Sequence, residues 1–103
     1  MTTFEMDFGT SRFEMIQSEN TYRGTGNKCI QIHCREIGQQ FWEPFGRLTV
    51  NVEGVKLQSN EILVKNWSEN EGWAEAVARK LGYIKTTRYV RTGFVEAFIW
   101  EKV

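Results

Sequence analysis

The sequence is poor in the residues on which most active sites depend. It contains one histidine, His33, so a Ser-His-Asp or Cys-His site would have to use this residue. Its neighbour Cys34 lies in a segment that alternates like a strand, where adjacent side chains point to opposite faces. The carboxylates are scattered along the chain without a pair at a diagnostic spacing. We therefore expect that the protein is not an enzyme.

The two cysteines exclude a disulfide and match a metal site poorly. Cys29 and Cys34 lie five residues apart in the alternating segment. Their Cα atoms would be about 16 Å apart at ~3.3 Å per residue, whereas a disulfide needs a separation below about 7 Å. The alternation also separates Cys34 from Cys29 and His33, and no fourth zinc ligand is evident. We expect two free thiols, no metal and no cofactor.

Net charge, proline and long apolar runs are also lacking. Thirteen acids balance 13 bases, which argues against a general nucleic-acid coat protein and against a wholly acidic DNA mimic. No apolar run approaches the length of a membrane span, and the N-terminus has no basic stretch before an apolar run, unlike a signal peptide. One proline and no Ser/Gly/Pro-rich run leave no linker. We expect a single cytoplasmic domain over residues 1–103 that does not bind a membrane.

The clearest element of the sequence is a helix predicted over residues 69–81. Ser68 occupies the N-cap position and Glu71 follows three residues later, which is the spacing of a capping box. Gly82 is suited to the left-handed conformation that ends many helices. An apolar stripe with a period of about four residues would lie flat on a sheet. This stripe consists of Trp73, Val77 and Leu81.

Alternation of apolar and polar residues predicts β-strands on both sides of this helix. They are expected at residues 3–9, 12–17, 29–36, 47–53, 83–90 and 93–103, with a short extended piece at 61–66 and a loop at 18–28. The last strand is apolar on both faces, which indicates a central strand. We predict an α+β fold with one antiparallel sheet of five or six strands and the helix packed on one face. The predicted core contains Trp73, Val77, Leu81, Val50, Val52, Phe94 and Phe98.

Charged residues form two groups that are candidates for binding a partner. The acidic group consists of Glu69, Glu71 and Glu75. The basic group consists of Arg79, Lys80, Lys85, Arg88 and Arg91, with tyrosines interleaved. Acids at the start of a helix also complement its dipole, and the bases also suit a helix end followed by an exposed hairpin. Basic residues interleaved with aromatics are, however, the pattern of a nucleic-acid surface.

Three aromatic residues lie in the segment 37–46, which Pro44 and Gly46 punctuate as a turn. They are Phe41, Trp42 and Phe45. Aromatic side chains in such a loop either seal one end of the core or serve as an anchor for a partner. We favour the first interpretation and keep Phe41 and Trp42 as candidates for the second.

Two stretches of the C-terminal half carry a family resemblance. The first is NEILVKNWSENEG at residues 60–72, and the second is RYVRTGFVEAF at residues 88–98. Together they resemble a family of small proteins carried by bacterial plasmids, phages and integrative elements. Its pattern is approximately Asn-Glu-x-x-(Leu/Val)-Lys-Asp-Tyr-Ser-Glu-Asn-Glu-Gly, a helix, then Arg-x-Val-x-Ser-Gly-Phe-Val. This chain departs from it with Asn66 for the Asp, Trp67 for the Tyr and Thr92 for the Ser.

The resemblance implies a function but assigns no residue a role, because the family has no established activity. Genes of this kind occur where anti-defence proteins are found, and the chain looks like an anti-CRISPR inhibitor of a Cas9-class nuclease. The implied partner is the nuclease or its guide RNA complex in a bacterial host cell. The acidic group would then enter a basic channel of the nuclease. The alternative is a small nucleic-acid-binding module that uses the basic segment 79–91.

Overall fold

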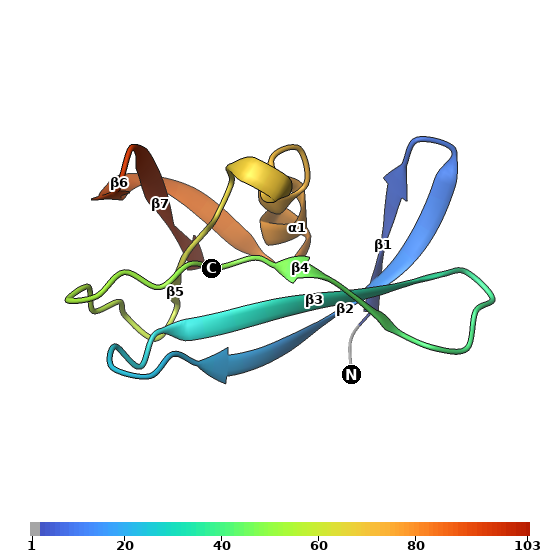
Figure 1. Ribbon diagram of the computed structural model, residues 1–103, viewed down its shortest axis with the longest axis horizontal. Helices are drawn as coiled ribbons and strands as arrows, with labels where there is room; N and C mark the ends of the chain where they lie inside the picture. Colours follow the sequence, from blue (N-terminus) through green and yellow to red (C-terminus); the bar gives the residue numbers. More distant parts are fainter. Residues whose placement is uncertain (1–2) are drawn as a thin grey trace.

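The computed structural model describes residues 3–103, which form two antiparallel sheets and one short α-helix (Figure 1). The four-stranded sheet has the order β1-β2-β3-β4, with β1 at Thr3–Phe8, β2 at Ser11–Thr21, β3 at Lys28–Glu36 and β4 at Glu43–Arg47. The three-stranded sheet has the order β5-β7-β6, with β5 at Glu61–Leu63, β6 at Tyr83–Thr92 and β7 at Val95–Lys102. The α+β class is therefore as predicted, but the prediction of a single sheet of five or six strands is wrong.

The first sheet begins with the predicted hairpin, and its second strand is longer than expected. Strand β2 pairs with β3 as far as Thr21 and Lys28, so only residues 22–27 remain of the loop predicted at 18–28. Residues 18–21 are polar and turn-forming, but pairing with β3 satisfies their backbone groups and outweighs that preference. Along β3, Ile30, Ile32 and Cys34 point into the core, as their alternation predicts.

Residues 47–53 do not form the strand that their alternation predicts, because the chain crosses here from one sheet to the other. The Leu48 N–H donates to the Ile30 carbonyl of the first sheet at 2.9 Å. Two residues later the Val50 N–H donates to the Leu63 carbonyl of the second sheet at 3.1 Å. The backbone groups are therefore satisfied on two different sides. Arg47 still pairs with Gln31 at the end of β4, and among residues 48–53 the only ladder contact is the bridge between Thr49 and Val64.

The helix is shorter than predicted, and the capping box does not form. A 3₁₀ turn, η1, spans Ser68–Asn70, and the α-helix α1 spans only Ala74–Lys80. Ser68 has a left-handed φ of 59°, and no side chain caps either segment. Gly72, with a φ of 93°, separates the turn from the helix, whereas Gly82, with a φ of 94°, follows the end of α1 as predicted.

Asn70 explains why the helix cannot begin at residue 69. Its side chain is 1% exposed, and its amide donates to the Arg47 carbonyl at 2.6 Å and to the Lys65 carbonyl at 3.0 Å. These bonds fix the 3₁₀ turn against Lys65 and against residues 47–53, which we call the crossing segment. They also give both backbone carbonyls a donor. The chain must then turn at Gly72 before α1 begins.

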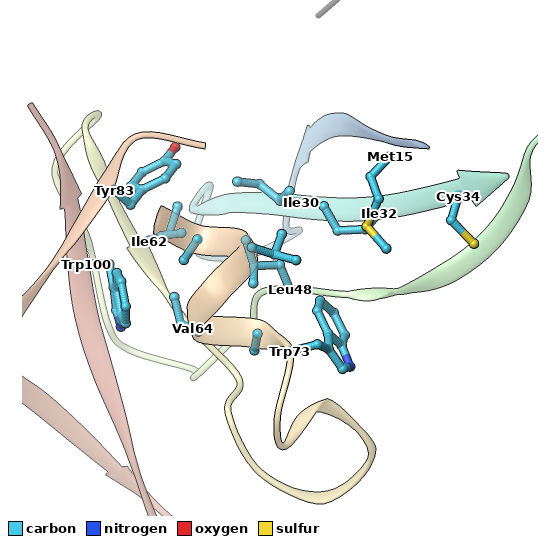
Figure 2. Close-up of a cluster of buried hydrophobic side chains, with 13 residues drawn as sticks. Met15, Ile30, Ile32, Cys34, Leu48, Ile62, Val64, Trp73, Tyr83 and Trp100 are labelled. Atoms are coloured by element: carbon cyan, nitrogen blue, oxygen red, sulfur yellow. The ribbon is translucent and has the colours of Figure 1, made fainter. Parts of the chain in front are cut away.

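The main core lies between the two sheets and α1 (Figure 2). Helix α1 contributes Ala74, Val77 and Ala78, while Trp73 precedes it and is 7% exposed. The largest fully buried side chain is Trp100 of β7. Among the predicted core residues, Trp73 and Val77 are buried, and four others are half-buried: Leu81, Val50, Val52 and Phe98.

The prediction that Phe94 belongs to the core is wrong. Phe94 lies in the two-residue connection between β6 and β7, where its side chain is fully exposed. Strand β7 is nevertheless central, as predicted, because Ala97 and Ile99 on its other face form a second apolar cluster with residues of the 50–57 segment. Residues 50–57, which include the end of the crossing segment and the residues after it, therefore cover this face of β7.

Two further features of the described residues bear on the expectations above. Cys29 and Cys34 are both free and both buried, so the prediction of free thiols is confirmed. No helix among residues 3–103 combines the length and the apolar character that crossing a bilayer requires.

Candidate functional site

The predicted acidic group is spread over three short segments, and most of its charge is already paired. Glu69 lies on η1 and forms an ion pair with Lys65, whose hydrogen bond lowers the pKa of Glu69 to about 2. Glu75 lies on α1, 3.0 Å from Lys85 Nζ. Burial opposes ionisation of Glu75, but hydrogen bonds from Asn66 and Lys85 outweigh it and lower its pKa.

Glu71 is the member of the acidic group that remains available. It makes no ion pair with any residue of the described chain. It lines a hollow of about 370 Å³ together with Glu75, Asn66 and Arg79. The structure therefore brings Glu71 and Glu75 together around one depression and leaves Glu69 outside its lining.

The predicted basic group is also largely neutralised. Four of its five members have a carboxylate partner: Arg79 and Lys85 pair with Glu75, Arg88 with Glu61 and Arg91 with Glu96. The closest contact joins Arg88 Nη2 to Glu61 Oε2 at 2.6 Å, and Glu61 is only 6% exposed. Lys80 has no ion pair within residues 3–103. This segment therefore offers a nucleic acid much less positive charge than its sequence suggests.

The three aromatic residues of the segment 37–46 lie in different environments: Phe45 seals the core, Trp42 is half-buried and Phe41 is exposed. The ring of Phe45 packs edge-on against Trp73, with centroids 4.9 Å apart, and stacks on Phe8 at 5.5 Å. Trp42 is half-buried under the Arg35 guanidinium, which lies 4.2 Å from its ring centroid. Phe41 lies in the connection between β3 and β4 and is 75% exposed. The core-sealing interpretation therefore holds for Phe45, whereas the role of Phe41 as an anchor for a partner stays a prediction.

The surroundings of Phe41 combine apolar and acidic groups. Ile37 of the same connection is 57% exposed. Glu36 and Glu43 border the connection, and neither has an ion-pair partner among the described residues. The negative charge of Glu43, together with burial, raises the pKa of the Cys34 thiol. This surface was only half visible in the sequence, which marks the aromatics but not the two free carboxylates.

Sequence reasoning missed a polar hollow beside the crossing segment. The hollow has a volume of about 420 Å³, and its polar lining comes from Tyr22, Arg47, Thr49, Asn51, Lys65 and Glu69. Its least expected member is Thr49, which belongs to the polar side of the alternating segment 47–53 but is 1% exposed. The sequence signal was weak, because the alternation places Thr49 at the surface.

No group of three or more His, Cys, Asp or Glu side chains that could hold a metal ion is found among residues 3–103. Comparison of the chain with models of protein families, with curated proteins and with solved structures gave no match.

Proposed function

We propose that the protein inhibits a Cas9-class CRISPR nuclease by binding the nuclease or its guide RNA complex. The observation that supports this proposal best is an exposed apolar surface on the connection between β3 and β4, residues 37–42, which we call the anchor loop. Ile37 and Phe41 form this surface. A few side chains that become buried at the centre of an interface, aromatic ones often among them, supply most of its binding energy. The sequence resemblance supplies the class of partner.

The charges around the anchor loop suit a basic partner. Glu36 and Glu43 carry negative charge that no base of the described chain neutralises, so they would add an attractive potential next to the apolar contact. A nuclease channel that holds guide and target is basic. Glu71, with Glu75 beside it, supplies a second acidic contact from the originally predicted group. The alternative function, nucleic-acid binding through residues 79–91, has less support because most of those bases are paired.

The test is a cleavage assay with a purified Cas9-class nuclease, its guide and labelled target DNA. We expect the protein to stop cleavage at a near-stoichiometric ratio without altering the guide. Phe41→Ala should raise the required concentration by about tenfold or more, since a central aromatic contact contributes on the order of 2 kcal/mol. Phe94→Ala is the matched control, because Phe94 is equally apolar and exposed at another loop.

Charge reversal separates the two acidic surfaces. Reversing Glu36 and Glu43 together should weaken inhibition more than reversing Glu69, Glu71 and Glu75 together. Shortening of the guide RNA with turnover would indicate an enzyme. If no nuclease of this class binds the protein, or if Phe41→Ala and Phe94→Ala behave alike, the proposal is wrong.

A further inference from the structure

We propose that the hollow beside the crossing segment is a binding site for a phosphate group of a single-stranded nucleic acid, with Arg47, Lys65 and Tyr22 as its donors. This site is independent of the anchor loop. Its lining includes Tyr22 of the 22–27 loop and Arg47, which pairs with Gln31 in the first half of β3, whereas the anchor loop follows the other end of that strand.

Arg47 is the main cation of this site. It is exposed at the end of β4 and has no ion pair among residues 3–103. Its guanidinium lies 5.9 Å from the ring centroid of Tyr22, and both residues line the hollow. A planar guanidinium with free N–H groups is the side chain best suited to bind a phosphate through two hydrogen bonds.

A chain of hydrogen bonds prepares the Tyr22 hydroxyl to donate to an anion. The Ile30 N–H donates to Thr49 Oγ1 at 3.1 Å, and Thr49 Oγ1 lies 2.9 Å from the Tyr22 hydroxyl. With Thr49 donating to the Tyr22 oxygen, the Tyr22 O–H points to the Cys29 thiol, and a ligand in the hollow would have to replace this weak acceptor. Burial raises the pKa of Tyr22, and its hydroxyl is protonated at neutral pH, as that of an ordinary tyrosine is. Thr49 is 1% exposed, so the chain is fixed by the fold.

Glu69 is the group that opposes anion binding here. It lines the hollow and pairs with Lys65, and its pKa of about 2 means that it stays ionised at neutral pH. The net charge of the lining residues is still positive, since Arg47 and Lys65 outnumber Glu69. Removing the charge of Glu69 should release Lys65 and strengthen anion binding. The proposal therefore predicts one substitution that raises the affinity.

A second hollow continues the site along the surface and favours a polymer over a free ion. It has a volume of about 340 Å³, and it shares Asn51 with the first hollow. Its base is Arg23, which also has no ion pair in the described chain, and its acid is Glu53. The side-chain oxygen of Asn51, Oδ1, accepts a hydrogen bond from the Thr25 hydroxyl at 2.7 Å. The side-chain NH₂ group of Asn51 therefore remains for a ligand. Two hollows that share a residue and each contain an unpaired arginine could contact more than one phosphate of the same strand.

The experiment measures the anisotropy of a short fluorescein-labelled oligouridylate during titration with the full chain. We expect Arg47→Ala to weaken binding by about tenfold, Arg23→Ala and Tyr22→Phe to weaken it several-fold, and Glu69→Gln to tighten it. The control is Lys80→Ala, which removes an unpaired base from the helix end and should change the affinity less than about twofold. The slope of log affinity against log salt should fall by about 0.7 in Arg47→Ala, as expected for one lost phosphate contact on a single strand. Thermal unfolding of each variant checks the fold.

Competition distinguishes a strand from a free anion. Inorganic phosphate and a mononucleotide should displace the oligouridylate only at much higher concentrations than unlabelled oligouridylate does. Equal displacement by inorganic phosphate would refute the second phosphate contact at Arg23. If Lys80→Ala weakens binding more than Arg47→Ala, or if the oligouridylate does not bind at low salt, the site is not where we place it.

Discussion

Replacing Gly46 by alanine tests the packing of the core directly. Eight of the nine glycines have a positive φ, so their role is explained by backbone conformation. Gly46 is the exception, because what it requires is space. A Cβ atom at this position would lie 2.7 Å from Cζ2 and 3.1 Å from Cη2 of the Trp73 ring. We therefore expect Gly46→Ala to force the indole out of its place.

The cost of this change follows from how firmly the indole is held. The Trp73 Nε1–H donates to the Glu69 carbonyl at 3.0 Å, and the ring packs edge-on against Phe45. Trp73 is 7% exposed, so the ring cannot withdraw without disturbing the main core. Overpacking of this kind costs about 1–3 kcal/mol. The lower backbone entropy of alanine in the unfolded chain offsets about 0.4–1 kcal/mol of that cost. The net destabilisation is then between about 0 and 2.6 kcal/mol, and because the indole is held on several sides we expect the upper half of this range.

The assay is urea unfolding of a double-mutant cycle that combines Gly46→Ala with Trp73→Phe. Phenylalanine lacks the outer indole atoms that the new Cβ would meet. Gly46→Ala should therefore cost at least 1 kcal/mol less in the Trp73→Phe background than in the parent. If Gly46→Ala leaves the free energy of unfolding unchanged, or costs the same in both backgrounds, then the indole does not lie against Gly46 and the packing described here is wrong.

Three further outcomes follow from the structure. Cys29 and Cys34 should react slowly with a thiol reagent in the native state and both react after unfolding without reductant, and a missing thiol would contradict this. Ser68→Ala should cost less than about 0.5 kcal/mol in urea unfolding, because Ser68 caps neither helical segment, whereas loss of a true N-cap costs about 1 kcal/mol. A backbone hydrogen bond from Gln58 and the contact with Arg88 lower the pKa of Glu61 below its ordinary value of 4.5. The stability that this carboxylate contributes is present above pH 4.5 and lost as the pH falls through its folded pKa. Glu61→Gln should therefore lower the free energy of unfolding at neutral pH and make it fall less steeply as the pH decreases below 4.5. If the free energy of unfolding depends on pH in the same way in the variant and the parent, Glu61 does not contribute stability through its lowered pKa.

The sequence predicted those elements that local periodicity and pairing between neighbours determine. The hairpin of β1 and β2, the strands β3, β6 and β7 and the central position of β7 follow from alternation or from a segment that is apolar on both faces. The stripe of Trp73 and Val77 is buried as predicted, because a period of about four residues matches one helix face. In these segments the local preference and the tertiary contacts agree.

The errors lie where a long-range contact outweighs the local pattern. The amide of Asn70 bonds to the Arg47 carbonyl of the crossing segment and to the Lys65 carbonyl, and this fixes a 3₁₀ turn where the capping-box spacing predicts the start of a helix. Residues 47–53 alternate like a strand, but their N–H groups are divided between two sheets. Phe94 keeps the parity of the core face of β7, yet it falls in the turn. The period of apolar residues within one segment does not show the Asn70–Arg47 bond, the division of N–H groups between two sheets or the position of the β6–β7 turn.

The same reasoning applies to the candidate sites, because ion pairs connect residues that are distant in sequence. Arg88 pairs with Glu61, 27 residues away, and Arg35 with Glu14, 21 residues away. A run of bases in the sequence therefore does not show how much positive charge a partner meets. When charges are ranked by what remains unpaired among the described residues, the segment 79–91 retains only Lys80, whereas the unpaired Arg47 and Arg23 line two hollows that share Asn51. A nucleic acid that binds this protein should therefore depend on residues that the sequence gives no reason to group.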